Sequence, residues 1–144
     1  MYEYRCKVVH IVDGDTVDVD IDLGFGVWMK KQRIRLYGID TPESRTRDLE
    51  EKKYGQAAKA FLTGMLDDEA GIILKTHKDK EGKFGRILGE LWRNTDFADQ
   101  SINEYMIEKY HAVRYFGQSK KDIEEEQLKN RELVTLLWFL FIFF

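Results

Sequence analysis

The sequence has little cysteine or histidine, and each scarcity excludes a kind of chemistry. Its 144 residues include one cysteine, Cys6, and three histidines. A single cysteine cannot form an intrachain disulfide, and no Cys/His spacing fits a zinc site, so metal–thiolate chemistry is excluded. We expect Cys6 to be a small buried hydrophobe on an early strand. The histidines His10, His77 and His111 are scattered, and no pair of them indicates a site.

No apolar run is long enough to cross a membrane. The segment Leu133–Phe144 holds eleven apolar residues and Thr135, whereas a spanning helix needs about 20 apolar residues. This segment has three interpretations: a last helical turn with an apolar tail that docks on the domain, a contact with an oligomer or a membrane surface, or a non-native C-terminus. We favour the first and the third. No secretory signal is visible, because Met1 leads within a few residues into a strand pattern that carries Arg5 and Lys7. The compartment, secreted or cytoplasmic, stays open.

The charge balance excludes a uniformly basic nucleic-acid coat but not a local basic groove. The chain has 23 Lys and Arg against 26 Asp and Glu, a net charge of −3. Residues 30–93 hold 15 basic against 11 acidic side chains, so the middle of the chain is basic and the remainder is acidic. The length suits one domain, and 43% apolar with 34% charged residues is typical of a globular protein.

The first 39 residues predict three strands joined by short turns. Residues 4–12 and 27–39 have strand-like patterns, and residues 15–22 alternate cleanly, with valine and isoleucine on one face and Asp18, Asp20 and Asp22 on the face we expect to meet solvent. The intervening Asp13-Gly14-Asp15 and Leu23-Gly24-Phe25-Gly26 segments are typical of turns. Together they predict a β-meander.

The rest of the chain predicts one helix, two strands and two further helices. Apolar residues at helical spacing cover 54–66, and strands are expected over 72–76 and 86–92. A capping box at Ser101 opens a second helix, and Ser119 opens a third. Five strands with a helix after the third predict a mainly β, α+β domain: a five-stranded OB-fold barrel with three helices. We expect this domain over residues 1–132, with 133–144 as its apolar tail.

Asp15 is the first residue that could carry chemistry. Strand alternation places it at the end of the apolar face of residues 15–22, where a carboxylate is costly unless a cation or donors satisfy it. A turn cap that binds nearby amides explains it equally well from this segment alone.

A second cluster follows the third strand. Arg33 and Arg35 share one strand face, and the strand ends in Asp40 and Glu43 around Pro42, the only proline. Proline stiffens this segment. A salt-bridged turn is the simple alternative, but surface ion pairs contribute only about 0–1 kcal/mol and give little reason for so rigid a loop.

Combined with the later Lys83-Phe84-Gly85-Arg86 turn, which is weak alone, these residues form a chemical set. Asp15, Asp40 and the Thr41 carbonyl could ligate a hard divalent cation. Arg35 and Arg86 could bind phosphate oxygens. Glu43 could orient or deprotonate a water. Such a set is what phosphodiester hydrolysis requires.

These residues fall in three of five short motifs. The five are Val12-Asp13-Gly14-Asp15-Thr16-Val17, Arg35-Leu36 followed by Ile39-Asp40-Thr41-Pro42-Glu43, Lys53-Tyr54-Gly55 followed by Ala58, Lys83-Phe84-Gly85-Arg86, and Asn103-Glu104. In this combination, from about Val8 to about Leu133, the chain resembles the staphylococcal nuclease (thermonuclease) family.

The resemblance implies a calcium-dependent, sugar-nonspecific endonuclease that cleaves DNA and RNA and leaves 3′-phosphate ends. It places calcium on Asp15, Asp40 and the Thr41 carbonyl, and the scissile phosphate on Arg35 and Arg86. Glu43 would activate the water. Lys83, Phe84 and Tyr115 would contact the substrate.

Two departures from the family pattern predict weaker nucleotide binding. The family commonly has tyrosine where this chain has Phe84, and Gly117 replaces one of two tyrosines that typically flank the base. The alternatives to a nuclease are an inactive OB-fold nucleic-acid-binding module and an interaction domain that uses the tail. All five cleavage residues are present, which favours the nuclease. We expect a monomer without a stable protein partner.

Overall fold

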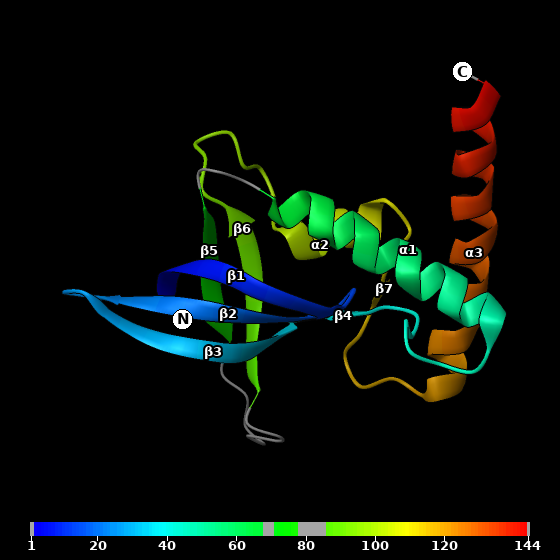
Figure 1. Cartoon of the computed structure of the whole chain (residues 1–144). Coiled ribbons are helices and arrows are strands. Elements are labelled where there is room, and N and C mark those ends of the chain that lie inside the picture. Colours follow the sequence, from blue (N-terminus) through cyan, green and yellow to red (C-terminus); the bar gives the residue numbers. More distant parts are fainter. Residues whose placement is uncertain (1, 68–70, 78–85, 144) are drawn as a thin grey trace.

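The computed structural model describes residues 2–67, 71–77 and 86–143, with side chains as far as Phe141. Five strands form a closed barrel in the order β1-β2-β3-β6-β5 (Figure 1), so the five-stranded barrel predicted from the sequence is confirmed. The parallel pair is β3 with β6, and the other neighbours are antiparallel. The barrel strands are β1 (Glu3–Asp13), β2 (Thr16–Gly24), β3 (Val27–Leu36), β5 (Ile72–His77) and β6 (Ile87–Arg93).

Two short strands were missed by the sequence analysis. β4 (Ile39–Asp40) pairs antiparallel with β7 (Val113–Arg114) outside the barrel. Two residues are too few for an alternation pattern to be visible. Their pairing brings the segment after β3 against a segment more than 70 residues later, and so positions the loop that carries the acidic residues.

The apolar face of the meander forms the core as predicted. Val17, Val19 and Ile34 have no exposed surface, and Leu36 is 1% exposed. Asp18 differs from the expectation of a solvent-facing carboxylate, because it is buried beneath Arg33, its direct partner in the β2–β3 register. Arg33 Nε and Nη2 donate to its two oxygens over 2.9 and 3.2 Å.

Cys6 is buried in the barrel core, as the sequence analysis predicted. Loss of hydration raises the pKa of its thiol to about 12. The thiol therefore stays protonated and behaves as a small apolar side chain.

The three helices begin at capped residues. α1 (Leu49–Leu66) starts five residues before the apolar pattern, because the Asp48 side chain accepts hydrogen bonds from the amides of Glu50 and Glu51. α2 (Ile102–Glu108) is capped by Ser101, whose hydroxyl accepts from the Glu104 amide, as the capping box predicted. α3 (Lys120–Phe143) has its first turn bound to Ser119 through the Asp122 amide.

α3 corrects the expected short helical turn and tail, because the helix continues through the apolar segment. It packs beside the start of α1 and then extends beyond it (Figure 1). Val134 is buried, and Trp138 stacks on Tyr54 with ring centroids 5.5 Å apart. Phe139 and Phe141 are 61% and 89% exposed, so only one side of this segment is covered. In the described part of the chain, no helix is both long and apolar enough to cross a membrane.

Candidate functional site

Two carboxylates, one from a turn and one from a strand, converge on one arginine. Arg35, near the end of β3, places Nη2 at 3.4 Å from Asp15 Oδ2 and at 3.3 Å from Asp40 Oδ1. Its Nη1 donates to the Leu36 carbonyl over 3.0 Å, which fixes the guanidinium against its own strand. Asp15 comes from the β1–β2 turn and Asp40 from β4. The barrel end therefore concentrates two negative charges around one positive charge.

Thr41 completes the cluster of predicted metal ligands. Its amide donates to Asp15 Oδ2 over 3.2 Å, and its side chain is buried. The structure thus brings together Asp15, Asp40 and Thr41. Among the residues that the structure describes, no group of three or more His, Cys, Asp or Glu side chains could hold a metal ion. Any cation at this point would need the two carboxylates and backbone oxygen.

Glu43 lies on the loop after Thr41, with its side chain exposed. Its amide donates to the Glu51 carboxylate of α1 over 3.4 Å. Asp40, Thr41, Glu43 and Tyr115 all line an open cavity of about 440 Å³. This cavity offers room for a substrate next to the carboxylates.

The pKa values of two acids in this cavity are raised. Burial is the main cause for Asp40, whose pKa is raised to about 6, and the neighbouring charge of Asp15 adds to the effect. Partial loss of hydration is the largest cause of the raised pKa of Glu43, and the neighbouring charges of Asp13 and Asp15 add to it. Perturbed carboxylates in a cavity mark a candidate functional site, and a cation placed among them would relieve their repulsion.

The other predicted substrate contacts are placed in part. Arg86 directly precedes β6, and the parallel pairing of Ile34 with Ile87 puts its backbone beside the strand that carries Arg35. Tyr115 is 43% exposed. Lys83 and Phe84, the other predicted substrate contacts, lie outside the described residues.

A family model for "staphylococcal nuclease homologue" matches residues 33–134 of this chain. The chain belongs to this family. The matched range contains Arg35, Asp40, Glu43 and Arg86, whereas Asp15 precedes it.

Individual relatives extend the match to most of the chain. A thermonuclease of Staphylococcus hyicus is 26% identical over 94% of this chain and 76% of its own length. A thermonuclease of Staphylococcus intermedius is 32% identical over 84% and 72%. An uncharacterised protein of Bacillus anthracis is 33% identical over 85% of this chain. The chain spans only 53% of that relative's length.

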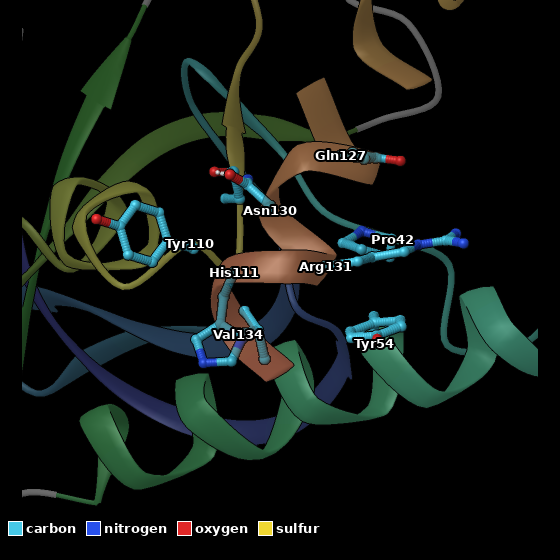
Figure 2. Close-up of a pocket in the computed structure, with 9 residues that line it drawn as sticks. Pro42, Tyr54, Tyr110, His111, Gln127, Asn130, Arg131 and Val134 are labelled. Carbon is cyan, nitrogen blue, oxygen red and sulfur yellow. Dashed lines mark hydrogen bonds between the residues drawn. The ribbon is translucent and has the colours of Figure 1, made fainter. Parts of the chain in front are cut away.

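In this staphylococcal nuclease homologue, α1 and α3 pack against the loop of residues 41–48, called the acidic loop below, which carries Glu43. Figure 2 shows Pro42 beside Arg131 and Tyr54, at a cavity of about 10 Å³ between these helices. A cavity of this size holds about one water, so it is a packing feature rather than a substrate site. The Tyr54 hydroxyl also forms a hydrogen bond with the Thr135 hydroxyl over 2.8 Å.

Three supporting residues were given no role in the sequence analysis. Gln127 Nε2 donates to Asp40 Oδ2 over 3.0 Å, and the Ser44 hydroxyl donates to Asp13. Gly55 of α1 lies against the backbone of Glu43, where an added Cβ would come within 2.2 Å of the Glu43 carbonyl oxygen. Gly55 stands in one of the recognised motifs and could have been found from its position. Gln127 gave no such signal.

Proposed function

We propose that this chain is a calcium-dependent nuclease that hydrolyses phosphodiester bonds of DNA and RNA and leaves 3′-phosphate ends. The observation that carries the proposal is the convergence of Asp15 and Asp40 on Arg35, within 3.4 and 3.3 Å of the same guanidinium nitrogen. Membership of the staphylococcal nuclease family and the names of its thermonuclease relatives support the reaction class.

The donor set fits calcium. Asp15 and Asp40 supply carboxylate oxygens at one place, and the carbonyl of Thr41 lies in the same segment. Calcium prefers oxygen ligands of this mixture, and burial of two acids favours a divalent cation between them. When bound there, calcium would withdraw charge from the phosphate and assist attack at phosphorus.

The remaining groups have distinct roles in this proposal. Arg35 and Arg86 bind phosphate oxygens and stabilise the extra charge of five-coordinate phosphorus. Glu43 accepts a proton from the attacking water. The water oxygen forms a bond to phosphorus, the bond to the 5′ oxygen breaks, and that oxygen takes a proton from solvent. The phosphate stays on the 3′ oxygen.

The test is cleavage of denatured DNA and of RNA with calcium and with a chelator. We expect cleavage with calcium and none after chelation. Glu43→Gln should lower the rate at least about 10²-fold, the scale for a positioned proton-transfer group. Glu50→Gln, which removes an exposed carboxylate from the first turn of α1, is the matched control and should leave the rate unchanged.

Two further measurements test the proposed products and the alternative of an inactive nucleic-acid-binding module. A 3′-phosphate blocks polymerase extension until a phosphatase removes it, so extension without phosphatase would contradict the proposed products. An inactive binding module would retain single-stranded DNA in a gel-shift assay and cleave nothing under any condition. Undiminished cleavage in chelator would contradict the calcium assignment.

A further inference from the structure

The rings of Tyr37 and His77 stack on the outside of the barrel. Their centroids are 3.9 Å apart and their planes differ by 9°. His77 ends β5, and its Nε2 contacts the Glu90 carboxylate of β6, which holds the imidazole from the side. Tyr37 remains 47% exposed although His77 covers one of its faces. The stack therefore presents an open phenol ring to solvent.

The backbone of Tyr37 is fixed on both sides. Its amide donates to the Gly89 carbonyl over 2.8 Å, and its carbonyl accepts from Asn103 Nδ2 over 2.9 Å. Asn103 is itself buried. A ring whose backbone and stacking partner are both held in place loses little freedom when a flat ligand binds, which favours binding.

This open ring borders the candidate active site. Arg35 lies on the face of β3 opposite the buried Ile34 and Leu36, and Tyr37 directly follows the strand with its side chain exposed. Two residues of chain place their Cα atoms at most about 7 Å apart. On the other side of Tyr37, the Tyr115 amide donates to the Gly38 carbonyl over 2.8 Å.

We propose that Tyr37, backed by His77, stacks on the base of a nucleotide that adjoins the scissile phosphate. The inference rests on the proposed nuclease function. A phosphate bound at Arg35 leaves a neighbouring nucleotide within reach of Tyr37.

A purely structural role is the competing explanation, because the stack also joins β3 to β5 across β6. The experiment separates the stacking role from the structural role by removing a base from the substrate as well as changing the protein. It uses a short single-stranded DNA in which methylphosphonates block every linkage but one. Three forms are compared: all bases present, the base 5′ of the open linkage removed, and the base 3′ of it removed.

We expect Tyr37→Ala to lower kcat/KM about tenfold on the form with all bases, mainly through KM, as for loss of one stacked base. The same substitution should have no effect on one of the two abasic forms. Tyr37→Phe should behave as wild type, and Tyr37→Leu, which keeps bulk without an aromatic face, should behave as Tyr37→Ala. Phe25→Ala, at the fully exposed tip of the β2–β3 hairpin, is the control and should change nothing.

An equal loss on all three substrates would assign Tyr37 a structural role and overturn the proposal, as would no loss on any. If the wild type cleaves no form, the nuclease proposal fails separately. The stacking proposal is then decided by fluorescence anisotropy of the same oligonucleotides in chelator, where Tyr37→Ala must abolish the affinity difference between the form with all bases and one abasic form.

Discussion

Gln127 of α3 donates a hydrogen bond from Nε2 to Oδ2 of Asp40 over 3.0 Å, although 87 residues separate the two. The other oxygen of the same carboxylate lies 3.3 Å from Arg35 Nη2. Asp40 is therefore held from two sides, by the barrel and by the C-terminal helix. Because Gln127 is buried, its amide cannot easily be replaced by water.

We expect Gln127→Ala to weaken activation by calcium about tenfold, because partners that orient a metal ligand commonly contribute 10–100-fold to metal affinity or activity. The measurement is the calcium concentration at half-maximal cleavage. Gln56→Ala, at an exposed position of α1, serves as the control. An unchanged calcium dependence in the folded variant would show that α3 does not position Asp40.

Gly55 provides a second test of how the acidic loop is positioned. A Cβ at Gly55 would lie 2.2 Å from the carbonyl oxygen of Glu43 and 2.6 Å from the amide nitrogen of Ser44. We expect Gly55→Ala to push this loop away from α1, to lower cleavage at least tenfold and to destabilise the fold by about 1–3 kcal/mol, as overpacking does.

Gly64 of the same helix is the matched control for that substitution. It is exposed, and an added Cβ would meet nothing within 4 Å. Gly64→Ala should therefore raise the free energy of unfolding by about 0.5–1 kcal/mol through helix propensity and leave cleavage unchanged. Thermal denaturation and the cleavage rate, measured for both variants, check the pair. Wild-type activity in Gly55→Ala would mean that the loop does not need its close approach to α1.

The barrel could be predicted because its strands carry their pattern locally. The alternating apolar residues 17, 19 and 21 all became buried, as did Ile34 and Leu36. The Asp18 side chain was expected to face solvent, because alternation shows which face of a strand a residue lies on but not which other side chains cover that face. Arg33, its cross-strand partner, could be identified only once the β2–β3 register was known.

The same limit applies to the site. Asp15 and Asp40 stood out because acids at strand ends beside an arginine are visible in the sequence, and the fold brings them together. The support from Gln127 was not predictable, because it depends on where α3 packs against the β4–β7 pair. The path of α3 in turn depends on contacts such as that of Trp138 with Tyr54, which no local pattern encodes.

The ion pair of Asp18 with Arg33 predicts a pH dependence of stability. Hydrogen bonds from Arg33 hold the pKa of the Asp18 carboxyl below its ordinary value. Since the folded state binds this proton less tightly than the unfolded state does, the stabilisation is complete above the unfolded pKa, near 3.9, and is lost as the pH falls through the folded value. We expect Asp18→Asn to lower the free energy of unfolding by about 1 kcal/mol at neutral pH, a modest value because Arg33 is half exposed.

Urea denaturation of both proteins between neutral pH and about pH 2 would measure that difference. The gap between wild type and Asp18→Asn should narrow on acidification below about pH 4. Asp22→Asn, on the same strand near the hairpin, is a control, because the Asp22 carboxylate accepts a hydrogen bond from the local Gly24 amide. A gap that stays constant across this range would show that the ionised form of Asp18 contributes nothing.

The apolar end of α3 gives the last prediction. Trp138 stacks on Tyr54 and has the Lys53 ammonium 5.3 Å from its ring centroid, whereas Phe141, one turn later, is 89% exposed. Trp138→Ala should destabilise the fold by about 1–3 kcal/mol, since aromatic pairs add about 0.5–1.5 kcal/mol to the burial of the ring. Phe141→Ala should change stability by less than about 0.5 kcal/mol, as at other surface positions. Equal effects of the two substitutions on the unfolding midpoint would contradict one-sided docking of this segment on α1.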